Sequence, residues 1–289
     1  MVSWMLISFP MKILMVGWQG MLGADLLKVF GPKHQLFTPS LEELDITKPD
    51  QCRVWLDRCR PDAVICAAAL TDVDYCESHA EEAFLVNGEG MGYLAKACAE
   101  ADCPAVHYST DYIFDGRKKE AYLEEDAPNP LSVYGKSKLR GEELLREYLP
   151  EHLILRISWL FGHNGKNFIR TILNLARTNA QLRVVDDQRG GPTYTRDVAC
   201  CTARLLAAGC RGTYHVTNSG TCTWYELACK TIEWAGIQDV HVTPVTTSEY
   251  PRSAPRPANS VLANARLARE GFPMLQSWPL AVQEYLREM

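Results

Sequence analysis

The chain has 289 residues, of which 47% are hydrophobic and 22% are charged, with 30 Lys and Arg against 35 Asp and Glu. A chain of this size and composition can bury a large core, so we expect a globular protein. The net charge of -5 and the lack of a dense basic run argue against nucleic acid or an anionic membrane as a partner. No stretch reaches the roughly 20 apolar residues that a membrane-spanning helix needs.

The eleven cysteines are scattered without paired spacing, and Cys200 and Cys201 are adjacent. This pattern suggests neither a disulfide framework nor a zinc site, so we expect reduced thiols and a cytoplasmic protein. Residues 1–10 are apolar but lack the leading positive charge and the cleavage site of a secretory signal. We interpret them as an N-terminal extension that precedes a first strand.

A glycine-rich turn separates the first predicted strand, residues 12–16, from the first predicted helix, residues 24–30. Glycines allow a tight turn and a close approach of the backbone to a pyrophosphate, and the helix N-terminus adds unpaired N–H groups. The spacing is Gly-x-x-Gly-x-x-Gly. This setting predicts dinucleotide binding by Gly17, Gly20, Met21, Leu22 and Gly23.

The second predicted strand, residues 35–38, ends without the acid that usually selects NAD. It continues into Pro39 and Ser40, which leaves the choice between NAD and NADP open. Two interpretations of the following Asp45 have comparable weight. Asp45 accepts a hydrogen bond from the adenine amine while Ile46 packs on the adenine ring, or Asp45 caps the helix predicted over residues 49–59.

The third predicted strand, residues 62–69, ends in Ala67, Ala68 and Ala69. Small residues at the carboxyl end of a strand let a cofactor lie close to it. We assign Leu70 and Thr71, which follow, to the same cofactor surface.

Two acids, Asp72 and Asp74, stand in the loop after this strand. No third hard ligand has a spacing that supports a metal site, so we interpret both as helix caps. A long helix that contains Asn87 is predicted over residues 80–101, and a strand over residues 105–109. Alternating strands and helices with short connectors predict an α/β protein with a Rossmann-like, doubly wound parallel sheet.

Ligands of such sheets lie beyond the carboxyl ends of the strands, which places Ser109 and Thr110 at the cofactor. A loop over residues 114–133 then leads to Tyr134 and Lys138. These two residues are four apart on a predicted helix and therefore share one face. Because a nearby ammonium stabilises a phenolate, we expect Tyr134 to exchange a proton near neutral pH.

The second half of the chain has shorter, mixed elements, which predict a smaller mixed α/β lobe that binds substrate. We expect residues 11–161 to form mainly the NAD(P)-binding domain, and residues 162–289 mainly the substrate lobe. A later strand and helix from about residues 182–216 are expected to return to the first domain. The predicted elements of this half are a helix over 167–179, strands over 182–185 and 212–216, and helices over 197–208 and 224–235.

Eight motifs in chain order carry a resemblance that spans nearly everything from Met11 on. They are Gly17-x-x-Gly20-x-x-Gly23, Leu44-Asp45-Ile46-Thr47, Cys66-Ala67-Ala68-Ala69-x-Thr71, His107-Tyr108-Ser109-Thr110-Asp111-Tyr112, Tyr134-Gly135-x-x-Lys138, Arg156-Ile157-Ser158-Trp159, Asp187-Gln188-x-Gly190-x-Pro192-Thr193 and Arg256-Pro257-x-Asn259-Ser260. On these residues the chain resembles the extended short-chain dehydrogenase/reductase superfamily and, within it, the dTDP-4-dehydrorhamnose reductase family.

The resemblance implies that NADPH or NADH reduces the 4-keto group of a dTDP-linked 6-deoxy sugar, dTDP-4-dehydro-L-rhamnose, to give dTDP-L-rhamnose. It implies that Tyr134 donates the proton that neutralises the growing charge on the carbonyl oxygen. Lys138 favours the phenolate and bonds the nicotinamide ribose, and Thr110 orients the same oxygen. The same resemblance makes Tyr108 a cofactor contact.

The resemblance also implies which residues hold the nucleotide-sugar substrate. Asp111 and Trp159 are expected to contact the sugar. Arg256, with Arg252 nearby, is expected to grip the diphosphate, because a guanidinium fork matches phosphate oxygens.

The chain departs from the family pattern at four positions. Cys66 and Leu70 stand where the family often has Asn and His, which weakens detail at the cofactor. Some members bind magnesium between subunits through glutamates, but the matching positions here are Asp25 and Arg196. An arginine cannot ligate a cation, so we predict no metal site.

Two other activities of the same superfamily fit the residues less well than the reductase. A dehydratase needs an acid where Tyr112 stands, and an epimerase would use the same Tyr134 and Lys138 with tightly held NAD. The alternative from another class is a non-catalytic subunit like the regulatory partner of methionine adenosyltransferase, which the intact Thr110, Tyr134 and Lys138 disfavour. The sequence leaves open the exact sugar, the nucleotide and the oligomeric state, for which a homodimer is one option.

Overall fold

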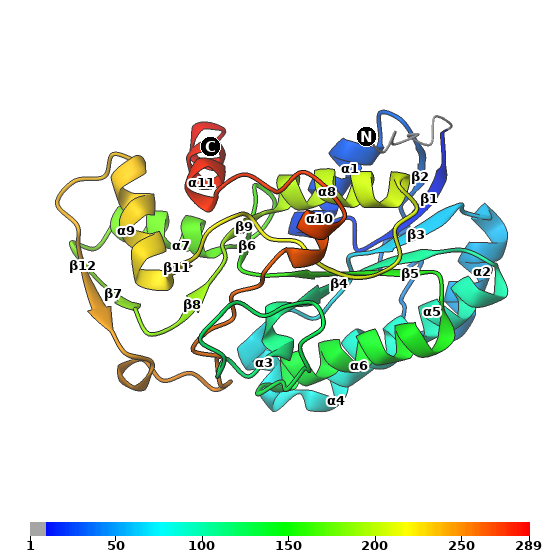
Figure 1. The fold of residues 1–289 in the computed structure, drawn as a ribbon, viewed down its shortest axis with the longest axis horizontal. Helices are drawn as coiled ribbons and strands as arrows, with labels where there is room; N and C mark the ends of the chain where they lie inside the picture. Colours follow the sequence, from blue (N-terminus) through cyan, green and yellow to red (C-terminus); the bar gives the residue numbers. More distant parts are fainter. Residues whose placement is uncertain (1–9) are drawn as a thin grey trace.

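A six-stranded parallel sheet forms the centre of the computed structural model, which describes residues 10–289 (Figure 1). The N-terminal extension expected over residues 1–10 lies, apart from Pro10, outside the described residues. The strands run in the order β10-β5-β4-β3-β1-β2. They are β1 (Lys12–Val16), β2 (Gln35–Phe37), β3 (Ala63–Cys66), β4 (Ala105–Thr110), β5 (His152–Ile157) and β10 (Gly212–His215).

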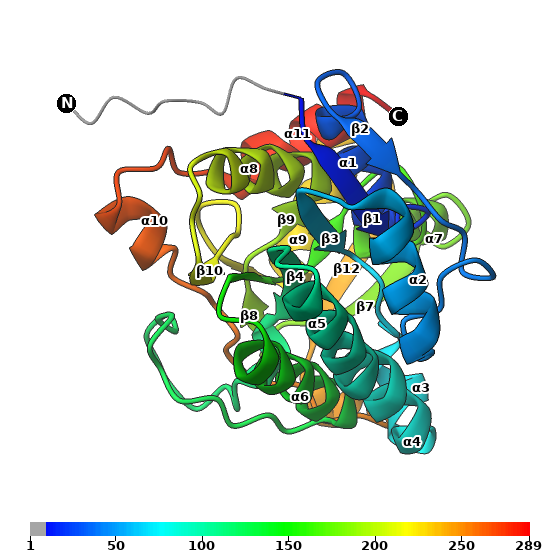
Figure 2. The same ribbon diagram turned by 90° about the vertical axis from the view of Figure 1, so that its right-hand side faces the viewer.

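Helices cover both faces of this sheet, as the view along the strands shows (Figure 2). On one face lie α1 (Met21–Phe30) and α8 (Thr195–Ala207), and on the other α2 (Pro49–Cys59), α5 (Gly90–Glu100) and α6 (Val133–Tyr148). The side chains of β1 alternate between the two cores: Ile13 and Met15 pack with the first group, Leu14 and Val16 with the second. Coverage on both faces explains why the strand is an unbroken apolar run, and the predicted fold class is confirmed.

The order in which successive strands are added to the sheet reverses between β1 and β3. From β1 the chain moves outward to β2, crosses back to β3, and then continues through β4 and β5 on the other side. A crevice opens at such a point, beyond the carboxyl ends of the strands. The glycine turn after β1, residues 67–71 after β3, and Thr110 at the end of β4 all meet there.

A smaller lobe, on the left in Figure 1, has cores of its own. The strand expected over residues 182–185 is β7 (Gln181–Val185). It pairs in parallel with β12 (His241–Val245) rather than with the large sheet. By contrast, β10 pairs with β5 of the large sheet, and α8 packs against that sheet. The remaining elements are β6 (Leu160–Phe161), α7 (Phe168–Ala176), β7 (Gln181–Val185), β8 (Arg189–Gly190), β9 (Thr193–Tyr194), β11 (Cys222–Thr223), α9 (Trp224–Trp234), β12 (His241–Val245), η3 (Thr247–Glu249), α10 (Ala265–Arg269) and α11 (Trp278–Arg287).

The helix predicted over residues 80–101 is confirmed, and it contains a π-helical turn. After α3 (Val73–Ser78), the chain forms α4 (Ala80–Ala83), a π-helical turn η1 (Phe84–Glu89) and then α5. A short 3-10 turn, η2 (Asp111–Ile113), follows β4. Single π-helical turns inside helices often occur at functional sites, and this one contains the buried Asn87.

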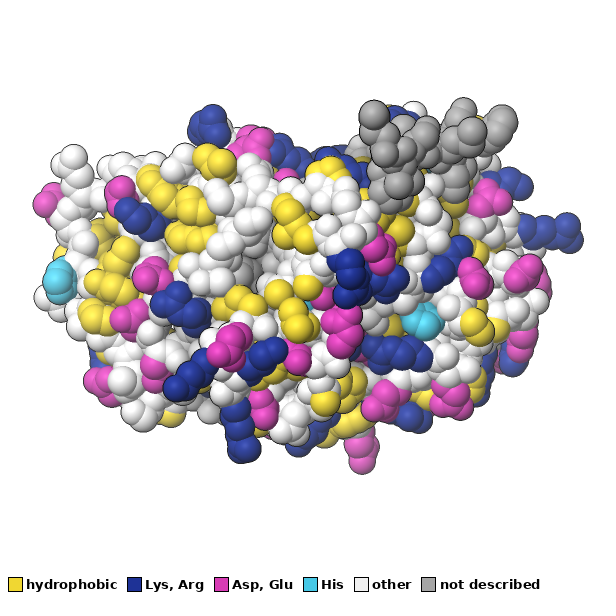
Figure 3. Space-filling view, in the orientation of Figure 1, with side chains coloured by type: hydrophobic (Ala, Val, Ile, Leu, Met, Phe, Trp, Pro, Cys, Tyr) yellow, Lys and Arg dark blue, Asp and Glu magenta, His cyan; other side chains and the backbone are white. Residues whose placement is uncertain are grey.

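All eleven cysteines are free thiols. None of the helices within residues 10–289 is both long and apolar enough to cross a membrane. On the face shown in Figure 3, positive and negative side chains are interspersed over most of the surface.

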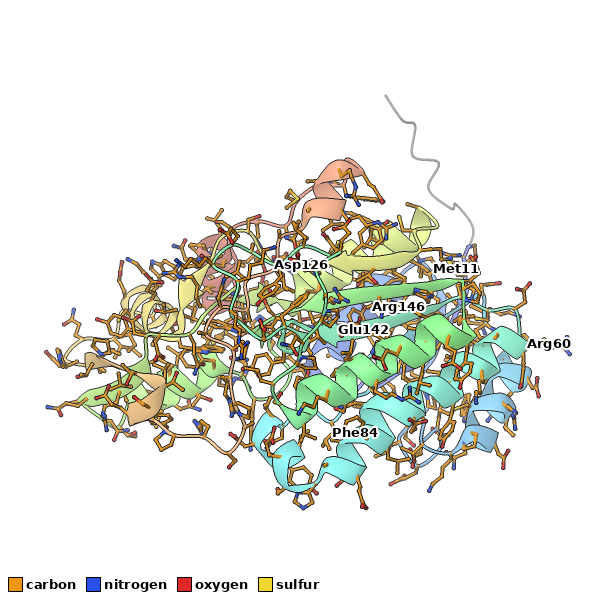
Figure 4. All side chains as sticks on the ribbon, turned by 60° about the horizontal axis from the view of Figure 1, so that its bottom comes forward. Met11, Arg60, Phe84, Asp126, Glu142 and Arg146 are labelled. Carbon is orange, nitrogen blue, oxygen red and sulfur yellow. The ribbon has the colours of Figure 1, made fainter. Side chains whose placement is uncertain are left out.

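A buried ion pair fixes α6 to the sheet. The Glu142 carboxylate, on α6, accepts from the Arg156 guanidinium of β5 at 3.0 and 2.9 Å and from Arg146 at 2.6 Å. Glu142 and Arg146 point from α6 toward β5 in Figure 4. Although burial opposes the charge, the two guanidinium groups lower the pKa of Glu142 to about 2. The pair therefore keeps its charges and holds the helix that carries Tyr134 and Lys138.

We expect Glu142→Gln to destabilise the protein by about 3 kcal/mol at pH 7, because it leaves the buried Arg156 charge without its partner. The free energy of unfolding in urea measures this. Since the folded-state pKa is lowered, the difference is fully present above about pH 4.5 and shrinks as the pH falls toward 2. The matched control is Glu143→Gln on the same helix, whose side chain is exposed and which should cost below about 1 kcal/mol. Equal losses for the two variants would contradict the role of the buried pair.

Candidate active site

A cavity of about 400 Å³ lies at the carboxyl ends of the central strands. It brings together most of the residues predicted for the site, from the glycine turn, the ends of β3 and β4, α6 and the segment after β5. The predicted residues that line it are Gly20, Met21, Leu22, Gly23, Ala67, Ala68, Ala69, Thr71, Tyr108, Thr110, Asp111, Tyr134, Lys138 and Trp159. Four further motif residues, Ser109, Tyr112, Ile157 and Ser158, line it as well. Val73, Leu160 and Trp224 also line it, and the sequence did not single these out.

The glycine turn is packed so tightly that side chains do not fit. Gly17 has a φ of +77°, and a Cβ there would lie 2.4 Å from the Ala68 nitrogen. A Cβ on Gly23 would lie 2.4 Å from the Gly17 oxygen. Gly20 caps α1 without a side-chain hydrogen bond to the first-turn N–H groups. The turn thus presents bare backbone and a free helix N-terminus to the cavity, which suits a phosphate.

Asp45 and Ile46 stand outside the cavity lining. The Asp45 carboxylate accepts from the backbone N–H and the hydroxyl of Thr47, at 2.9 and 2.8 Å. The residue that caps α2 is Lys48, so the expectation that Asp45 caps this helix is wrong. The Asp45 carboxylate instead stabilises the short turn that precedes α2. Ile46 is buried against Gly90, and its contact with an adenine ring stays a prediction.

Asn87 links the loop after β3 to α6. Its amide accepts from the Leu70 N–H at 2.8 Å and donates to the Leu70 carbonyl at 3.0 Å. It also donates to the Ser137 hydroxyl at 3.0 Å, between Tyr134 and Lys138 on α6. Leu70, predicted as a cofactor contact, therefore lies behind the lining with its backbone fixed. The signal in the sequence was an asparagine within an apolar helical run, which the π-helical turn buries.

Tyr134 and Lys138 lie one turn apart on α6, whose N-terminus is capped by Ser132. Burial raises the pKa of Tyr134, so the phenol is protonated at neutral pH, and the expected lowering by Lys138 is wrong for the free protein. The physical reason is the loss of water around the phenol. The Lys138 ammonium lies 3.2 Å from the His107 imidazole. Burial also lowers the pKa of Lys138 to about 8. Tyr134 therefore keeps its proton at neutral pH, which is the form that a proton donor requires.

Thr110 and Asp111 form a polar corner next to Tyr134. The Thr110 hydroxyl donates to Asp111 at 3.1 Å and accepts from the Tyr112 N–H at 3.2 Å, and it also lies beside the Tyr134 phenol. Burial raises the pKa of Asp111 to about 7. The Ser260 hydroxyl lies beside the Asp111 carboxylate and, with Thr110, opposes this shift.

Arg256 does not line the cavity. Its guanidinium binds the Asp74 carboxylate at 2.7 and 2.9 Å, while Arg252 is 3.9 Å from the same acid. The two arginines, Arg256 foremost, lower the pKa of Asp74 to about 2. The expectation that Asp74 caps a helix is therefore wrong, whereas Asp72 does cap α3, by accepting from the Tyr75 N–H. Arg256 also borders Tyr112, which lines the cavity.

The positions matched to the magnesium ligands of some family members carry other contacts. Asp25 accepts from the Thr195 hydroxyl at 2.6 Å and from Lys28 at 3.0 Å. Arg196 pairs with Glu284 and Glu288. Over the described part of the chain, no three His, Cys, Asp or Glu side chains gather as a metal site would require.

A glycine turn at the switch point of a Rossmann-like sheet, with a Tyr-x-x-x-Lys pair that lines the same cavity, defines the class of short-chain dehydrogenase/reductase proteins. The family described as the RmlD substrate binding domain matches residues 11–289. The chain therefore belongs to this family, and the resemblance on its motifs is confirmed.

Named relatives agree with this assignment. The chain is 40% identical to the spore coat polysaccharide biosynthesis protein SpsK of Bacillus subtilis, over 96% of this chain and 97% of SpsK. It is 36% identical to dTDP-4-dehydrorhamnose reductase of Escherichia coli, over 96% and 98% of the two chains. A crystal structure of dTDP-4-dehydrorhamnose reductase from Bacillus anthracis in complex with NADP has a TM-score of 0.95 and 33% identity, and covers 97% of this chain and 100% of that one.

We expect Asn87→Ala to lower the free energy of unfolding by about 1–3 kcal/mol, because it leaves the Leu70 N–H and carbonyl unpaired. It should also weaken NADPH binding, measured by fluorescence titration, because the cofactor loop loses its tie to α6. Asn179→Ala, at an exposed helix end, is the matched control and should change neither quantity. Unchanged stability and NADPH affinity in Asn87→Ala would refute this role.

Proposed function

We propose that the protein is an NAD(P)H-dependent oxidoreductase that reduces the 4-keto group of dTDP-4-dehydro-L-rhamnose to give dTDP-L-rhamnose. The observation that carries the proposal is that Thr110, Tyr134 and Lys138 line the same cavity as the glycine turn. The names of the relatives, which include several dTDP-4-dehydrorhamnose reductases, support the same substrate. SpsK supports a role in polysaccharide biosynthesis.

The cavity fits a dinucleotide at its glycine side. Gly20 to Gly23, at the start of α1, line the cavity, and Ala67 to Ala69 add no bulk, so a pyrophosphate can approach the turn. When bound, NADPH or NADH supplies the hydride. We assign its contacts to the glycine turn, to residues 67–71, to Tyr108 and Lys138, and to Asp45 and Ile46 at the adenine end.

At the sugar carbonyl, Tyr134 donates the proton that neutralises the charge on oxygen. Its raised pKa keeps the phenol protonated until negative charge develops beside it. Thr110 orients the carbonyl oxygen by a hydrogen bond. The Lys138 ammonium, charged below about pH 8, stabilises the phenolate that Tyr134 leaves behind.

The remaining substrate contacts are assigned to Asp111, Trp159 and Arg256. The Asp111 carboxylate lines the cavity and can accept from a sugar hydroxyl, and Trp159 offers an apolar surface. Arg256 would have to loosen its pair with Asp74 to reach a diphosphate, or act through Tyr112.

We further propose a two-part organisation, with residues 11–161 as the main cofactor domain and residues 162–289 as the main substrate lobe. The free thiols fit a cytoplasmic location. A homodimer stays a prediction.

Mixing the purified protein with NADPH and dTDP-4-dehydro-L-rhamnose should cause loss of the absorbance of the reduced cofactor. Tyr134→Phe removes the proton donor and should lower kcat by roughly 100-fold or more while NADPH still binds. Tyr148→Phe, near the other end of α6, is the control and should keep wild-type rates. No oxidation by wild type would overturn the function, and wild-type turnover by Tyr134→Phe would overturn the role of the phenol.

The pH dependence tests the charge on Lys138. Because burial lowers its pKa to about 8, the ammonium is present below that pH and is lost as the pH rises. We expect kcat/KM to fall about tenfold per pH unit above pH 8. A profile that stays flat to pH 10 would contradict a requirement for the charged lysine.

A further inference from the structure

Two tryptophans from distant parts of the chain lie face to face at the cavity. Trp159 follows the carboxyl end of β5 in the large sheet, and Trp224 is the first residue of α9 in the smaller lobe. Their ring centroids are 3.5 Å apart and their planes are inclined by 7°. Both rings line the cavity that holds Thr110 and Tyr134. The stack therefore joins the two lobes at the site itself.

Trp159 has a backbone conformation that a bulky side chain rarely adopts. Its φ is +44°, in the left-handed region, where steric contact with Cβ is unfavourable. The indole also lies directly on Gly190, where an added Cβ would approach the ring to 2.3 Å. Packing around the indole has to offset the unfavourable backbone, and Trp224 supplies a whole ring face of that packing.

The smaller lobe holds Trp224 firmly. Phe168 packs on the ring with centroids 4.5 Å apart. The helix begins with a capping box, in which Thr223 accepts from the Glu226 N–H at 3.1 Å and Glu226 accepts from the Thr223 N–H at 2.7 Å. The Thr223 hydroxyl also donates to Asp186 at 2.6 Å. Trp224 is thus a fixed support against which another ring can be positioned.

We propose that Trp224 is a substrate-positioning residue, which holds the Trp159 indole as the apolar wall of the sugar site. This inference rests on the proposed function, because the apolar ligand part is the C–H face or methyl group of a 6-deoxyhexose. An aromatic ring held rigidly in a pocket binds such a surface without losing conformational freedom of its own. The nicotinamide cofactor, bound at the glycine turn, does not depend on this wall.

The test is the steady-state kinetics of Trp224→Leu and Trp224→Phe with dTDP-4-dehydro-L-rhamnose and NADPH. Trp224→Leu should raise KM for the sugar nucleotide about three- to tenfold, the range of one aromatic pair, and leave KM for NADPH unchanged. Trp224→Phe keeps an aromatic face and should recover most of the loss. Trp234→Phe, on the same helix but packed on Trp278 away from the cavity, is the matched control and should behave as wild type.

A sugar KM equal to wild type in Trp224→Leu would overturn the proposal, and so would an equal rise in both KM values, which indicates general damage. Circular dichroism gives a second readout that needs no substrate. Two indoles stacked this closely should produce a coupled pair of bands that Trp224→Leu and Trp159→Leu each abolish and Trp234→Phe keeps. Bands that survive in Trp224→Leu would also overturn it.

The outcomes separate this inference from the function on which it rests. If wild type does not oxidise NADPH, the proposed function fails and the substrate role of Trp224 falls with it. If wild type is active and Trp224→Leu is kinetically normal, only the role of Trp224 fails.

Discussion

The placement of α6 is the constraint on which the rest of the site depends, because this helix carries both Tyr134 and Lys138. The buried Glu142 carboxylate ties it to Arg156 of β5. Close packing adds to this, since a Cβ on Gly141 would lie 2.2 Å from the Asn87 carbonyl oxygen. A helix held by a buried ion pair and by backbone contact has little freedom to shift, so the two side chains keep their positions relative to the sheet.

Asn87 extends the same constraint to the cofactor side. By bonding Leu70 in both directions and Ser137 once, it joins the loop after β3 to α6. The smaller lobe is joined at the opposite side by the stack of Trp159 on Trp224. The cavity is therefore preorganised from three directions, which lowers the cost of aligning a cofactor with a sugar carbonyl.

Burial decides the proton chemistry. Removing Tyr134 from water raises the pKa of the phenol, and removing Lys138 from water lowers the pKa of the ammonium to about 8. In the free protein the ammonium lies against His107. The resting state is a protonated phenol with a cation one helical turn away, which suits proton donation to an oxygen that gains charge.

The sequence by itself determined the parallel sheet, the glycine turn, and the meeting of Thr110 with Tyr134, because these follow from local patterns and from the rule that ligands lie at the carboxyl ends of strands. Only the tertiary structure decided the pairing of Asp74 with Arg256, the burial that raises the pKa of Tyr134, and the arrival of Trp224 at the cavity. All three features depend on contacts between residues far apart in the chain and on exclusion of water. Neither long-range contacts nor exclusion of water has a local signature in the sequence.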